Sequence, residues 1–162
     1  METFTAGGMP YTLRAVRPGD EELITSQRHR MFVDAGRPDN ALLKERSAAF
    51  RAWLKPRLAD GRYFGWFAVN SGVVAAGLGM MTVDWAPHPM HLEPARGYIL
   101  NVFTEPAHRR RKLAERLTAH AVAEARRRGL HVLFLHATDA GKLVYQKAGF
   151  TARNEMILEL KD

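Results

Sequence analysis

Four consecutive cationic residues near the middle of the chain could bind a ligand that carries several negative charges. They are Arg109, Arg110, Arg111 and Lys112, and they stand between an apolar run and an amphipathic helical pattern. A helix that begins directly after a strand points its free N–H groups, and the positive end of its dipole, above the strand end. Full positive charges at the same place fit closely spaced phosphates, as in a pyrophosphate.

The alternative interpretation of this cluster is a solvated basic start of a helix. Cations at a helix N-terminus oppose the helix dipole, which costs about a few tenths of a kcal/mol for each residue. Because the sequence accepts this cost four times in a row, it favours an anion site.

The elements on either side must position the cluster. Residues 97–104, GYILNVFT, are rich in β-branched and aromatic side chains, which predicts a short buried strand. Pro106 cannot continue a central strand. From Arg109 onward, apolar residues recur every fourth position, which predicts a helix with one buried face that ends before Gly129. The buried positions of this helix are Leu113, Leu117, Ala121 and Ala125.

Asn101 is a polar amide inside the apolar stretch ILNVF of this strand. If it is buried, its amide must be hydrogen-bonded. It is therefore either a structural bridge or a contact to the substrate, and the sequence favours neither.

Length and composition limit the class of protein. The 162 residues, 46% of them hydrophobic, predict a single domain over 1–162 with a loose lead at 1–10. The absence of cysteine excludes a disulfide, a thiolate zinc site and a cysteine nucleophile. A formal net charge of +7 predicts a polyanionic partner, such as nucleic acid, an anionic membrane surface or a phosphorylated cofactor. No stretch has the length of a membrane span, so we expect a cytoplasmic protein with no membrane partner.

The periodic segments of the chain predict an α/β (α+β) fold. The short link Asn70-Ser71-Gly72 predicts an antiparallel hairpin. The order β-α-α-β-β-β-α-β-α-β predicts a mixed, mostly antiparallel central sheet flanked by helices. Strands are expected at 11–17, 63–69, 73–83, 96–104, 130–137 and 154–160, and helices at 20–36, 41–58, 109–128 and 140–147.

Two segments together resemble the GCN5-related N-acetyltransferases (GNAT). They are NVFTEPAHRRRKLA at 101–114 and LHATDAGKLVYQKAGF at 135–150. The resemblance implies the GNAT fold, acetyl-CoA as co-substrate, and transfer of the acetyl group to a primary amine of a small molecule, peptide or protein. The family's pyrophosphate loop, Gln/Arg-x-x-Gly-x-Gly/Ala, maps onto Arg109, Arg110, Arg111, Lys112, Leu113 and Ala114.

Lys112 departs from this family pattern, because it stands where the family usually has glycine. Glycine lets the backbone approach the phosphates with no side chain in the way. The departure raises the alternative of a GNAT-fold protein that binds acyl-CoA without turnover. Tyr145 argues against that alternative, since a protein that only binds acyl-CoA would not need it.

The resemblance also implies roles for residues of the second segment and of the central strand. Tyr145 would protonate the leaving sulfur, for which a phenol with a pKa of about 10 is suited; its alternative role is ordinary packing. In the family a bulge splays the central strand from its neighbour, and the backbone of Val102, Phe103 and Thr104 would there hold the pantetheine arm and polarise the thioester carbonyl. Thr138 would join the cofactor contacts.

The sequence does not identify the general base or the acceptor. Glu105, Glu93, His91, Asp84 and a bridging water all qualify as base. We predict no metal site, because the His88 and His91 pair lacks a third ligand at suitable spacing. Exposed strand edges and an apolar last strand favour a homodimer.

A second functional hypothesis is that the arginine-rich helix binds nucleic acid. The arginines at 126–128 and the cluster at 109–112 stand at opposite ends of one helix, too far apart for a compact phosphate-binding patch. The chain also lacks a helix-turn-helix, a zinc finger and a set of stacking aromatics. These observations argue against nucleic acid.

Overall fold

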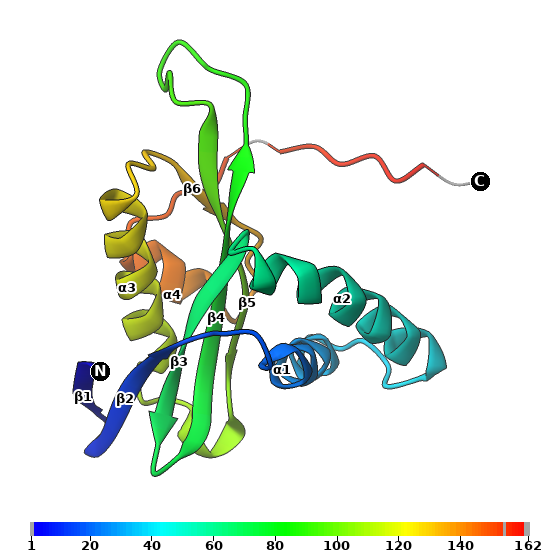
Figure 1. Ribbon diagram of the computed structural model, residues 1–162, viewed down its shortest axis with the longest axis vertical. Coiled ribbons are helices and arrows are strands. Elements are labelled where there is room, and N and C mark those ends of the chain that lie inside the picture. Colours follow the sequence, from blue (N-terminus) through cyan, green and yellow to red (C-terminus); the bar gives the residue numbers. More distant parts are fainter. Residues whose placement is uncertain (1, 154, 161–162) are drawn as a thin grey trace.

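A six-stranded sheet with helices on both faces forms the framework of the protein, as a computed structural model shows (Figure 1). The structure describes residues 2–153 and 155–160. The strands are β1 (Glu2–Ala6), β2 (Met9–Ala15), β3 (Tyr63–Asn70), β4 (Val73–Asp84), β5 (Ala95–Thr104) and β6 (Leu133–Leu135). The helices are α1 (Glu21–Asp34), α2 (Ala41–Ala59), the short 3₁₀ helix η1 (Pro106–His108), α3 (Leu113–Arg127) and α4 (Lys142–Lys147).

The strands follow one another across the sheet in the order β1-β2-β3-β4-β5-β6. Neighbouring strands are antiparallel except β5 and β6, which run parallel and are joined through α3. The mixed, mostly antiparallel sheet flanked by helices is confirmed, as is the hairpin of β3 and β4. None of the helices in 2–153 and 155–160 is long and apolar enough to cross a membrane.

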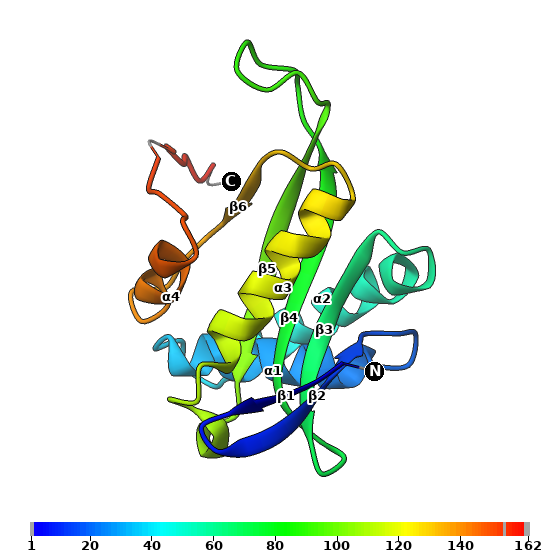
Figure 2. The same cartoon turned by 90° about the vertical axis from the view of Figure 1, so that its left-hand side faces the viewer.

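The two faces of the sheet are covered by different helices (Figures 1 and 2). On one face α3 buries the predicted apolar stripe of Leu113, Leu117, Ala121 and Ala125. On the other face α1 and α2 pack against β3 through a second cluster. Its buried members are Ile24, Leu54, Leu58, Tyr63 and Phe67.

The first residues are not a loose lead, because residues 2–6 form β1 and pair with β2. The turn between them is Gly7-Gly8, and both glycines have positive φ, 54° and 75°. A two-residue hairpin turn with positive φ at both positions favours glycine. The Gly-Gly dipeptide was therefore the hairpin signal in this part of the sequence.

The last strand expected at 154–160 does not form over residues 155–160, and Asn154 lies outside the described residues. This segment runs away from the sheet (Figures 1 and 2). Met156, Ile157, Leu158 and Leu160 are 74% to 96% exposed. Apolar composition alone does not make a strand, because the backbone groups also need a partner strand. The homodimer stays a prediction.

The helix expected from Arg109 begins four residues later, at Leu113. Arg110 and Lys112 have φ of 61° and 62°, which an α-helix cannot accommodate. The basic cluster is therefore a loop between η1 and α3, and the cations do not lie within the first turn of a helix.

Candidate functional site

Strand β5 carries a bulge at its centre. The register with β4 shifts between Gly77 and Gly79, so that Asn101 and Val102 together lie opposite Leu78. Asn101 has a φ of 56°, in the left-handed region that non-glycine residues rarely adopt. A bulge bends its strand and redirects the neighbouring side chains.

Beyond this bulge, β5 and β6 separate. The two strands pair only over Gly97–Ile99 and Leu133–Leu135. Val102, Phe103 and Thr104 follow, and among the described residues no strand pairs with their outer edge. Their backbone groups on that edge can bond a ligand instead, except that the Thr104 carbonyl already accepts a hydrogen bond from the basic loop.

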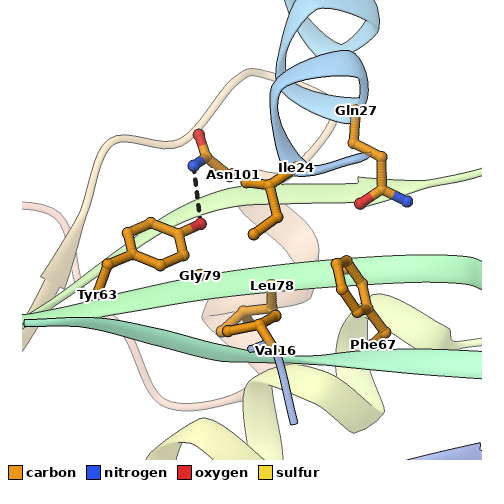
Figure 3. A pocket seen from close by; sticks show the side chains of 9 residues that line it. Val16, Ile24, Gln27, Tyr63, Phe67, Leu78, Gly79 and Asn101 are labelled. Carbon is orange, nitrogen blue, oxygen red and sulfur yellow. Dashed lines mark hydrogen bonds between the residues drawn. The ribbon is translucent and has the colours of Figure 1, made fainter. Parts of the chain in front are cut away.

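The Asn101 side chain is buried and bonded on both sides. Its Nδ2 donates to the Tyr63 hydroxyl at 3.0 Å, and its Oδ1 accepts from Nη1 of Arg28. Figure 3 shows the Asn101–Tyr63 bond beside a small cavity that Gln27 and Phe67 also line. Burial raises the pKa of Tyr63 to about 12. Asn101 therefore acts as a structural bridge between β3, β5 and α1.

Two arginines of the basic loop are held by the protein itself. Arg109 donates from Nε to the Thr104 carbonyl at 3.1 Å and pairs with Asp34. Arg111 donates from Nη1 to the Gly7 carbonyl at 2.9 Å, and its buried Nε has no partner within 2–153 and 155–160. These two residues fix the loop to its surroundings.

The other two cations of the loop, Arg110 and Lys112, are exposed and form no ion pair or side-chain hydrogen bond within the described part of the chain. They line a groove with Arg111 and Arg116, between β1 and the start of α3. Lys112 is the N-cap residue of α3, and its side chain makes no capping hydrogen bond. Uncapped N–H groups and two exposed cations at one place can bind phosphate oxygens.

Tyr145 lies on α4 and is half-buried. Its ring packs edge-on against Phe150 at 6.0 Å between centroids, and Gly141 leaves room for it, since a Cβ there would lie 3.1 Å from the ring. Burial raises the pKa of Tyr145 to about 12. Its hydroxyl forms no hydrogen bond with another described residue, so it is available to a ligand.

Thr138 precedes α4 and accepts hydrogen bonds from Gly141, the N-cap residue of this helix. Its Oγ1 and its carbonyl both accept from the Gly141 N–H, at 3.2 and 3.0 Å. These hydrogen bonds give Thr138 a structural role, and its contact to the cofactor stays a proposal.

The Acetyltransferase (GNAT) family model matches residues 26–150 of the chain. This chain belongs to the GNAT family. A GCN5-related N-acetyltransferase from Ralstonia eutropha JMP134 is 41% identical, with a TM-score of 0.88 over 93% of this chain and 98% of its own. A predicted acetyltransferase from Clostridium acetobutylicum, solved with acetyl-CoA, is 29% identical, with a TM-score of 0.82 over 93% and 96% of the two chains. Glucosamine-6-phosphate N-acetyltransferase from Arabidopsis thaliana, 14% identical, shares the fold with a TM-score of 0.68 over 94% of this chain and 99% of its own. A search of curated proteins finds no match.

The GNAT loop motif clarifies the position of Lys112. Its φ of 62° is one that glycine adopts without strain, and glycine is the residue expected there from the family pattern. The backbone therefore keeps the glycine conformation although the side chain is lysine.

The base candidates of this GNAT protein are not equally placed. Glu105 accepts two hydrogen bonds from Arg30, at 2.6 and 2.7 Å, which engages both of its oxygens. Asp84 ends β4, and His91 and Glu93 lie in the loop before β5, which extends beyond the end of the sheet (Figure 1). Glu105 is therefore the candidate whose carboxylate is already engaged by the protein.

Sequence reasoning missed two contacts that side chains of β5 make. Arg28 of α1 contacts the bulge through Asn101, and the Tyr98 hydroxyl lies 3.1 Å from Nδ1 of His136 just beyond β6. A signal existed for Arg28, which lies four residues after Ile24 and so on the same, buried side of its helix. No local pattern pointed to Tyr98 and His136, which are 38 residues apart.

Proposed function

We propose that this protein is an N-acetyltransferase that transfers the acetyl group of acetyl-CoA to a primary amine by direct attack in a ternary complex. The acceptor amine belongs to a small molecule, a peptide or a protein. The observation that carries the proposal is the separation of β5 from β6 beside a bulge, next to an uncapped and basic helix start. Membership of an acetyltransferase family supports the reaction class.

The residues present fit acetyl-CoA. Arg110, Lys112 and the N–H groups at the start of α3 would bind the pyrophosphate. The free edge of Val102–Thr104 would bind the amides of the pantetheine arm and polarise the thioester carbonyl. Acetyl-CoA supplies the thioester that is cleaved.

The reaction needs a neutral amine, stabilisation of the negative charge on the carbonyl oxygen, and a donor for the sulfur. The amine nitrogen forms a bond to the carbonyl carbon while the carbon–sulfur bond breaks. The nitrogen then loses a proton to solvent. Tyr145 would donate a hydrogen bond to the departing thiolate.

The raised pKa of Tyr145 defines this role more closely. With a pKa of about 12, the hydroxyl stays protonated at neutral pH. A thiol has a pKa of about 8.5, so full transfer of the phenol proton to the thiolate is unfavourable. Tyr145 would therefore stabilise the thiolate as a hydrogen-bond donor, and solvent would deliver the final proton.

The test combines binding and turnover. Calorimetric titration with acetyl-CoA should show micromolar binding, and release of free CoA thiol should follow the addition of an amine from a panel of amino acids, polyamines, amino sugars and short peptides. Tyr145→Phe should lower kcat about tenfold or more and leave the acetyl-CoA affinity unchanged, whereas Gln146→Ala on the same helix should change neither. Binding without turnover of any amine would favour the non-catalytic alternative, and absence of binding would refute the proposal.

A further inference from the structure

Arg28 is a half-buried cation without an anionic partner among the described residues. Burial lowers its pKa, which reflects the cost of desolvating the charge. Its neighbour on the helix, Arg30, is paired with Glu105, and Arg14 and Arg109 also have carboxylate partners. Among the described residues, Arg28 has one hydrogen bond, to the neutral amide of Asn101.

Its surroundings hold the guanidinium in place without neutralising it. The guanidinium carbon lies 4.8 Å from the Phe32 ring centroid and 4.5 Å from that of Phe50. Aromatic faces attract a cation but do not compensate it as a carboxylate does. The Arg28 residue as a whole is partly exposed, so the protein does not seal its side chain from a ligand.

The position of Arg28 relates it to the acceptor and not to the cofactor phosphates. It contacts Asn101 at the bulge, where the free edge of β5 begins, and it comes from α1. The opposite face of the sheet is filled by α3 and its buried side chains. An amine that approaches the opening between β5 and β6 from the α1 face therefore passes Arg28.

We propose that the acceptor of this enzyme is an amine that also carries a carboxylate, and that Arg28 binds this carboxylate. This inference rests on the proposed function, because it assumes that the site acetylates an amine. A planar guanidinium binds a carboxylate through two parallel hydrogen bonds. Arg30 of the same helix is engaged by Glu105, and a single positive charge matches a carboxylate better than a doubly charged phosphate.

The turnover experiment compares amines in pairs. Glycine, β-alanine, 4-aminobutyrate, 5-aminopentanoate and phenylalanine are each compared with their carboxamides, which retain the amine and lose the charge. The wild type should show at least about tenfold higher kcat/KM, per neutral amine, for the preferred acid than for its carboxamide. Arg28→Gln should reduce this preference to within about twofold, mainly by lowering the rate of the acid, and Arg28→Lys should restore part of it.

The control variant is Arg46→Gln, which removes an exposed arginine of α2. It should leave the preference intact. Equal rates for acids and carboxamides in the wild type, or an equal loss of both in Arg28→Gln, would overturn the inference, the second result showing that Arg28 only supports the fold.

Binding measurements separate this inference from the proposed function. Benzoate and benzamide are titrated into the wild type and Arg28→Gln without acetyl-CoA, followed by NMR. Binding of benzoate over benzamide that requires Arg28, in a protein that fails to bind acetyl-CoA, would support the carboxylate site and refute the acetyltransferase. Acetyl-CoA turnover with no preference for a carboxylate in either assay would refute the site and leave the acetyltransferase standing.

Discussion

The amide of Asn101 donates a hydrogen bond to the hydroxyl of Tyr63 at 3.0 Å, and this bond ties the bulge of β5 to β3 across β4. The arrangement depends on Gly79 of β4, because a Cβ there would lie 1.9 Å from the Tyr63 hydroxyl. The bond is buried, and it holds a residue whose φ of 56° lies in the left-handed region, which asparagine tolerates better than most residues do. The bulge is therefore maintained by a specific side-chain contact.

Tyr63→Phe should destabilise the protein by about 1–3 kcal/mol, since it leaves the buried Nδ2 of Asn101 without an acceptor. Urea unfolding measures the loss. Tyr98→Phe is the matched control, because the Tyr98 hydroxyl bonds to His136 at an exposed position and its removal should cost less. A smaller loss for Tyr63→Phe than for Tyr98→Phe would contradict this account of the bulge.

Lys112→Gly should stabilise the protein by about 1 kcal/mol. The φ of 62° is strained for lysine and unstrained for glycine, although glycine loses more backbone entropy on folding. Lys112→Ala keeps the strain and removes the charge, so it should give no such gain. Unfolding curves measure the stability of both variants, and titrations measure their affinity for acetyl-CoA. We expect Lys112→Ala to bind acetyl-CoA more weakly than the wild type, because it removes the proposed contact of the lysine to phosphate. A gain of stability in the alanine variant would argue against strain.

The contribution of Tyr145 should not depend on pH between 7 and 10. Burial raises its pKa to about 12, so the hydroxyl remains a donor over this whole range. The amine acceptor itself titrates, which makes the ratio of kcat between wild type and Tyr145→Phe the appropriate quantity. This ratio should stay constant, whereas a decrease centred near pH 10 would show an unperturbed phenol.

The sequence predicted the sheet and its helices because apolar periodicity and turn residues carry local information. It did not predict the conformation of the loop at 109–112, since nothing in the types of Arg110 and Lys112 favours positive φ. The bulge at Asn101 also depends on a residue 38 positions away, Tyr63. The apolar segment at 155–160 shows that a local pattern can also predict an element that does not form, because a strand needs a partner strand.

The stability difference between the wild type and Glu124→Gln should depend on pH. The Arg127 guanidinium, together with that of Arg128, lowers the pKa of Glu124 from about 4.5 to about 2. The folded state thus favours the charged carboxylate, and this contribution is complete above about pH 5 and is lost as the pH falls toward 2. Thermal unfolding at pH 7, 4 and 2 should show a lower Tm for the variant at pH 7 and convergence at pH 2.

A control for the previous variant is Glu22→Gln, which removes an ion pair with Arg51 in which both side chains are more than half exposed. Such pairs contribute little to stability. Its Tm at pH 7 should stay close to that of the wild type, and a Tm difference for Glu124→Gln that is as large at pH 2 as at pH 7 would exclude the carboxylate charge as its cause.

Gly7→Ala should weaken the attachment of the β1 hairpin to the basic loop more than Gly8→Ala does. Both glycines have positive φ, so alanine is strained at either position. At Gly8 the added Cβ meets no atom within 4 Å, whereas at Gly7 it would lie 2.8 Å from Cγ of Arg111, whose Nη1 bonds to the Gly7 carbonyl. We expect a cost of about 1 kcal/mol for Gly8→Ala and a larger cost for Gly7→Ala. Hydrogen exchange of the β1 amides measures the attachment, and equal protection in the two variants would show that the Arg111 contact contributes nothing.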